Sequence, residues 1–169
     1  MTVSAHDVAA YILERRGSMS TMKLQKLVYY SQAWHLVWDE EPLFTEAIEA
    51  WANGPVVYEL FDVHRGHFTV DSWPRGDRNN LADNERETVD VVLDGYGDLD
   101  GRKLSALTHG EGPWLDARDG LRPTESSSKE ITCDALQIYY TGVQEAAEAV
   151  AVDDVNWRDW ESADPADVI

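Results

Sequence analysis

Hydrophobic residues recur along the chain mainly at spacings of three and four, the period of helices packed on one face. Residues 4–17, SAHDVAAYILERRG, begin with Ser4 as a candidate N-cap and carry Asp7 three positions later. Their apolar side chains share one face, and Gly17 ends the pattern. This segment therefore predicts a short amphipathic helix.

The most hydrophobic segment is residues 22–38, MKLQKLVYYSQAWHLVW, where 11 of 17 positions are apolar or aromatic. These positions surround the helix instead of forming a stripe, which is typical of a helix enclosed by the rest of its domain. Ser20 or Thr21 can cap its start. The pattern predicts a buried central helix, with His35 as a core histidine.

Residues 48–57, IEAWANGPVV, predict a short extended segment at 48–51, a turn at Asn53-Gly54 and a helix from Pro55 to about His64. Glycine adopts backbone conformations closed to other residues, and proline at the first helical position loses no hydrogen bond. Trp51 would anchor this junction. The free N–H groups of a helix start can bind an anion, but a structural junction is the favoured interpretation.

The second half predicts further helices separated by loops. Residues 72–84 form a polar surface loop, after which Asp83 or Asn84 caps a helix that stops at Gly95 or Gly97. A short helix ends at Gly110, another starts at Pro113, and the loop 121–128 precedes the last long helix. The expected inner face of this last helix carries Leu136, Tyr139, Tyr140 and Val143.

These segments predict a mainly α fold: one compact helical domain, residues 1–150, around the helix 22–38, with room for a short β-ribbon. Residues 151–169 form an acidic tail in which Trp157 and Trp160 are the large apolar residues. The composition of this tail is compatible with partial disorder. We expect the domain to fold without it.

Charge and cysteine content narrow the class of function. Lysine and arginine total 14 against 32 aspartate and glutamate residues, a net charge of −18, which repels nucleic-acid phosphates. The acidity suits a basic protein partner, but equally a high-salt habitat or a lysine-poor genome. Cys133 is the single cysteine, and no segment is typical of a signal peptide or membrane helix. We therefore expect a cytoplasmic protein that binds neither nucleic acid nor membrane.

Catalytic signatures are weak. His64 and His67 have the spacing of a metal-binding pair on a helix, but Gly66 between them breaks the helix that would align them. Ser105, Thr108 and His109 share a short segment, where helix and cap roles are more common than nucleophilic catalysis. The chain has no G-x-S-x-G or phosphate-binding glycine loop. We predict no catalytic residue, metal or cofactor.

Three segments resemble the Panacea domain, also known from phage-associated GepA-like proteins. They are MKLQKLVYYSQAWHLVW, PLFTEAIEAWANGPVVYELF and LSALTHGEGPWLDAR, in this order. The resemblance covers about residues 5–145. It implies a largely helical antitoxin of a toxin–antitoxin pair that neutralises its toxin by direct contact and has no catalytic activity.

The family pattern falls on two groups of residues. Those that a shared scaffold explains are Leu24, Leu27, Tyr29, Tyr30, Trp34, Trp51, Gly54, Pro55, Val56, Leu107, Thr108, Pro113 and Trp114. Four polar residues are explained less well by a scaffold and are the candidates for contact with a partner. They are Gln25, Lys26, Gln32 and His109.

The resemblance favours an antitoxin whose cognate toxin is encoded beside it. Two rival hypotheses remain at this point. The first is an adaptor that presents a bound partner to a protease, in which case the abundance of the partner would fall. The second is a metal-dependent hydrolase built on His64, His67 and nearby acids, which a stoichiometric transition metal would support.

Overall fold

The computed structural model describes the backbone of residues 3–162 and the side chains of residues 3–149. The predicted mainly α fold is confirmed. The helices are α1 Ala5–Arg16, α2 Thr21–Trp38, α3 Tyr58–His64, α4 Asp83–Tyr96, α5 Gly101–His109, α6 Gly112–Arg118 and α7 Cys133–Ser162, with a 3-10 turn at Arg78–Asn80. The strands are β1 Met19–Ser20, β2 Ile48–Trp51, β3 Gly54–Val57, β4 Thr69–Val70 and β5 Glu130–Ile131.

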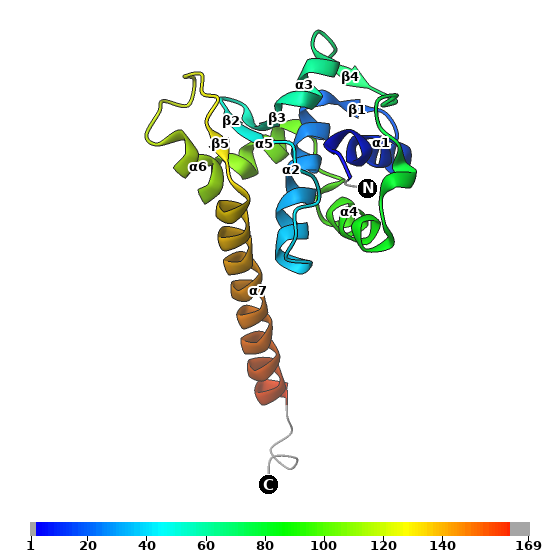
Figure 1. Ribbon diagram of the computed structural model, residues 1–169. Coiled ribbons are helices and arrows are strands. Elements are labelled where there is room, and N and C mark those ends of the chain that lie inside the picture. The colour runs from blue at the N-terminus through cyan, green and yellow to red at the C-terminus, as the bar shows by residue number, and fades with distance from the viewer. Residues whose placement is uncertain (1–2, 163–169) are drawn as a thin grey trace.

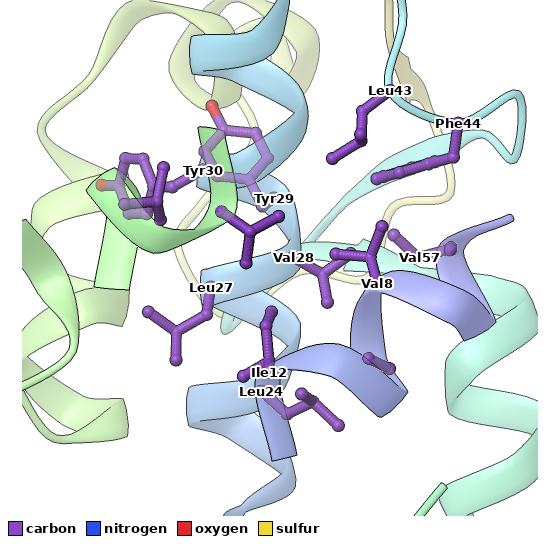
Figure 2. Close-up of a cluster of buried hydrophobic side chains, with 14 of the residues drawn as sticks. Val8, Ile12, Leu24, Leu27, Val28, Tyr29, Tyr30, Leu43, Phe44 and Val57 are labelled. Atoms are coloured by element: carbon purple, nitrogen blue, oxygen red, sulfur yellow. The ribbon is translucent and has the colours of Figure 1, made fainter. Parts of the chain in front are cut away.

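Helix α2 packs against α1, α4, α5, α7 and strand β3 (Figure 1). Its start is capped by Ser20, whose hydroxyl accepts a hydrogen bond from the backbone N–H of Lys23. Figure 2 shows its apolar side chains facing Val8 and Ile12 of α1 on one side and the 43–44 segment and β3 on another. His35 is buried in this helix, where its ring contacts the Thr88 hydroxyl at 2.8 Å.

The predicted capping of α1 is confirmed. The hydroxyl of Ser4 accepts from the backbone N–H of Asp7, and the Asp7 carboxylate accepts from the backbone N–H of Ser4. The same carboxylate also accepts from the backbone N–H of Asp77 at 2.8 Å. Asp7 therefore joins the first helix to the 72–84 segment as well as capping the helix.

Two small antiparallel sheets complete the domain. Strand β1 pairs with β4, and the other sheet has the order β3-β2-β5. In this larger sheet Trp51 lies opposite Gly54, so a two-residue turn joins β2 to β3. The extended segment predicted at 48–51 is confirmed as β2, whereas no pattern in the sequence indicates β5.

The helix predicted to begin at Pro55 is wrong, because Pro55 lies in β3 opposite Ala50 and α3 begins at Tyr58. The φ angle that proline fixes is also compatible with extended backbone, and Val56 and Val57 favour a strand. Pairing with β2 decides between the two conformations. The chain then bends into α3 only after β3 has been completed.

The 72–84 segment differs from the exposed loop that was predicted, because Trp73 and Leu81 are buried. Helix α4 is capped one residue earlier than predicted, at Ala82, whose backbone N–H donates to the Glu85 carboxylate. It ends at Gly97, one of the two glycines expected to stop it. The polar composition of this segment therefore does not indicate that Trp73 and Leu81 are buried.

Helix α7 packs against α2 and α6 and then extends away from the domain (Figure 1). Leu136 and Tyr140 are buried as predicted, but Val143 is 37% exposed because the helix has begun to leave the domain there. The predicted boundary at residue 151 falls within α7. The side chains of Trp157 and Trp160 lie outside the described residues.

Within the part of the chain described, no helix has the length and hydrophobicity needed to span a membrane.

Candidate functional site

The three sequence motifs meet at the turn between β2 and β3. The Ser105 hydroxyl on α5 donates to the Asn53 carbonyl at 2.6 Å. The Trp114 indole on α6 donates to the Trp51 carbonyl at 2.7 Å. Residues that are 52 and 63 positions from the hairpin in the sequence thus fix the backbone of its turn. We call this region, where α2, the β2–β3 hairpin, α5 and α6 join, the motif junction.

Gly54 is required at the centre of the motif junction. Its φ of +116° lies in a region that residues with a side chain rarely adopt. A Cβ atom at this position would lie 2.5 Å from Lys26 Cε and 3.0 Å from Thr108 Oγ1. Both the backbone conformation and the close approach of α2 and α5 therefore demand glycine.

Gln25 and Gln32 use their amide groups inside the protein. Gln25 accepts from the Val57 N–H at 2.9 Å, donates to the Val57 carbonyl at 3.1 Å, and lies 3.0 Å from His64 Nε2. Gln32 accepts from the Leu43 N–H at 2.7 Å and donates to the Phe44 carbonyl at 2.8 Å. The geometry thus assigns both glutamines a role in holding backbone, and their contact with a partner stays a prediction.

Lys26 is 1% exposed and lies against the hairpin turn. Burial disfavours the charged ammonium and lowers the pKa of Lys26 to about 7. Burial also lowers the pKa of His64 and of His109, and the neighbouring Lys26 lowers both further. Burial therefore favours the neutral form of all three side chains.

Replacing Lys26 by methionine is expected to alter how stability depends on pH. Between pH 7 and 9.5 the unfolded wild-type chain binds a proton that the folded chain does not, so its stability rises with pH. This slope is at most about 1.4 kcal/mol per pH unit. Lys26→Met should lose that rise and be more stable than the wild type at pH 7. Urea denaturation across this pH range measures both effects.

The exposed Lys129 supplies a matched control, because Lys129→Met removes the same charge at the surface. Its pH profile should follow that of the wild type. Parallel profiles for wild type and Lys26→Met would contradict the assignment of a destabilising buried charge to Lys26.

His109 lies half-buried at the end of α5, where its ring stacks on Trp114 with 4.2 Å between ring centroids. Its Nε2 atom is buried and has no hydrogen-bond partner among the described residues. Thr108, next to it, donates its hydroxyl hydrogen to the Ser105 carbonyl at 2.7 Å. The hydroxyls of Ser105 and Thr108 are thus both directed at backbone carbonyls, and neither donates to His109.

A network of tyrosines around Glu111 adjoins the motif junction. The Glu111 carboxylate accepts from Tyr30 at 2.5 Å and from Tyr140 at 3.2 Å, and the Tyr140 hydroxyl lies 3.0 Å from that of Tyr29. Burial raises the pKa of Glu111, while the two tyrosine hydrogen bonds oppose that rise. Sequence analysis missed Glu111, because one acid among 32 carries no signal of burial.

An open groove of about 530 Å³ lies beside the motif junction. We call it the sheet groove. It is lined by Glu49, Trp51, Ala52, Asn53, Val56, Tyr58 and Ser126–Ser128. Trp51, expected to anchor the junction, is half-buried here, whereas Trp114 of the motif junction is buried. Sequence analysis missed the groove because its walls come from segments 70 residues apart.

The predicted scaffold residues fall mostly in the interior. Buried among them are Leu24, Leu27, Tyr29, Tyr30, Gly54, Pro55, Val56, Thr108, Pro113 and Trp114. Trp34 is half-buried, and its indole donates to the Tyr96 hydroxyl at 3.0 Å. Leu107 differs, being 43% exposed on the outer side of α5.

The two histidines considered for a metal differ in their surroundings. His64 is buried beside Gln25, whereas His67 follows the end of α3 in an exposed loop. Within residues 3–149, no group of three or more histidine, cysteine, aspartate or glutamate side chains is arranged to hold a metal ion.

Comparison with known families gives one match. The model of the family described as antitoxin SocA-like, Panacea domain, matches residues 24–115. Searches of curated proteins and of solved structures gave no significant match. The matched range begins in α2 and ends in α6, and so contains the motif junction. The chain belongs to the antitoxin SocA-like, Panacea domain family.

Proposed function

We propose that this protein is an antitoxin that neutralises a toxin encoded beside it by binding that toxin directly. The observation that carries the proposal is the match of an antitoxin family over residues 24–115, more than half of the chain. In this proposal the protein acts in the cytoplasm as a binding protein and catalyses no reaction.

The chemistry of the motif junction supports a binding role over a catalytic one. Three of its polar side chains hold backbone: Gln25 binds β3, Gln32 binds the 43–44 segment, and Ser105 binds the hairpin turn. A catalytic group must instead reach a substrate with a free donor, acceptor or nucleophile. The junction therefore serves as a rigid support that presents the surrounding surface to a partner.

Co-expression with the product of the adjacent gene tests the proposal. The antitoxin should relieve the growth arrest caused by that product while the abundance of the product stays unchanged. Growth and the amount of epitope-tagged toxin are followed together, and a catalytically inactive toxin is the matched control. The two proteins should copurify.

Two other outcomes contradict this function. Growth rescue accompanied by loss of the toxin, and abolished in cells lacking the responsible protease, would assign the protein as an adaptor for proteolysis. Continued arrest with every neighbouring gene product would remove the antitoxin assignment for this chain.

A further inference from the structure

The outer face of the β3-β2-β5 sheet gathers a specific set of side chains. Along β2 the residues Ile48 and Ala50 are buried, whereas Glu49 and Trp51 point outward and are half-buried. Residues directly opposite one another on paired strands lie on the same face. Val56 of β3 and Glu130 of β5 both lie opposite Glu49, so they share this outer face.

Aromatic rings form one side of the sheet groove. Tyr58, which follows β3, is 42% exposed, and its ring centroid lies 6.3 Å from that of Trp51. Phe61 supports Trp51 from α3 with an edge-on contact at 4.8 Å. Exposed aromatic rings held in place by other rings are typical of residues that contribute most to binding.

Residues 126–128 also line the groove, and Arg118 holds the chain that leads into them. This buried side chain donates to the Ala50 carbonyl at 2.9 Å and to the carbonyls of Arg122 and Glu125 at 2.9 and 2.5 Å. The guanidinium also lies over the Trp114 ring, 4.9 Å from its centroid. The groove is therefore preformed, which lowers the entropic cost of binding.

Two carboxylates, Glu49 in the groove wall and Glu130 beside the groove on the neighbouring strand, are not neutralised by any described residue. Glu49 and Glu130 lie directly opposite each other across two strands, an arrangement that is unfavourable for like charges. Among residues 3–149, neither carboxylate takes part in an ion pair. From the side chains of these same residues, Glu49 accepts one hydrogen bond, from the Trp51 indole N–H at 3.1 Å. A cation from outside would relieve this repulsion.

We propose that the sheet groove is the docking site for a short basic segment of the partner toxin. An arginine or lysine of that segment places its charge between Glu49 and Glu130, and its aliphatic stem packs on Trp51 and Tyr58. This inference rests on the proposed antitoxin function. The groove volume of about 530 Å³ accommodates a few side chains, and the net charge of −18 steers a basic partner toward the protein.

Binding of the purified product of the adjacent gene to the full chain tests this site. The double variant E49Q/E130Q should bind about tenfold more weakly or worse, chiefly through slower association, and should depend less on salt between 0.1 and 1 M. The variant Tyr58→Ser should accelerate dissociation. The matched control E41Q/E87Q removes two exposed carboxylates elsewhere and should bind within about twofold of the wild type.

Three other outcomes of this binding measurement would each overturn the proposed docking site. A tight complex that is indifferent to E49Q/E130Q and Tyr58→Ser would overturn the docking site while leaving the antitoxin function in place. No complex at all would overturn the function and the site together. Self-association that Tyr58→Ser abolishes would assign the groove to a second copy of this chain and would also overturn the proposal.

Discussion

Replacing Gly54 with alanine is expected to lower the free energy of unfolding by about 2–6 kcal/mol. For a residue with a side chain, an unfavourable backbone region such as φ +116° costs about 1–3 kcal/mol. The added Cβ would also overlap Lys26, and overpacking in a core costs a further 1–3 kcal/mol or so. Chemical denaturation followed by circular dichroism measures the loss.

Gly66 offers a matched control for this prediction. It also has a positive φ, +84°, but an added Cβ there has no atom within 4 Å. Gly66→Ala should therefore cost only the backbone term, about 1–2 kcal/mol. Equal losses for the two variants would show that α2 and α5 do not constrain the hairpin turn.

Replacing Gln25 with methionine, which preserves most of the side-chain volume, is expected to cost about 2–5 kcal/mol. The change leaves the N–H and carbonyl of Val57 without their side-chain partner in the interior, and each unsatisfied buried group costs about 1–3 kcal/mol. It also removes the contact with His64. Urea denaturation at pH 7 measures the effect.

The same substitution at Gln137 is the control. Gln137 is half-buried and donates one hydrogen bond to the Leu36 carbonyl at the end of α2. Its loss should cost no more than about 1 kcal/mol, because water can replace the glutamine there. A small effect for Gln25→Met would instead indicate that its amide is not needed to hold β3, and would favour a role in contacting a partner.

The helices were the part of the fold that the sequence predicted well. The capping box at Ser4 and Asp7 and the dense apolar run at 22–38 are local signals, and the backbone follows both. Pro55 shows where local signals fail, because its φ suits both a helix start and a strand. Only pairing with β2, a contact outside the reach of periodicity, selects the strand.

The candidate site was less predictable, because its geometry also depends on contacts between segments that are far apart in the sequence. Gly54 and Thr108 could be identified as motif residues, but the close approach of Lys26 and Thr108 to Gly54 depends on three packed elements. The pairing of Glu49 with Glu130 required β5, which has only two residues and no recognisable pattern. Arg118 is similar, since nothing in the sequence shows that it joins the backbone of β2 to the segment that precedes Ser126.

The central claim, neutralisation by direct binding, is tested most directly with purified components. The activity of the toxin is titrated with the antitoxin in a solution that contains no protease, and the mass of the toxin is measured before and after. The account predicts a loss of activity that is complete at a fixed molar ratio, with an unchanged toxin mass and a stable complex. Full toxin activity at saturating antitoxin, or inhibition by a small fraction of one equivalent with an altered toxin mass, would contradict it.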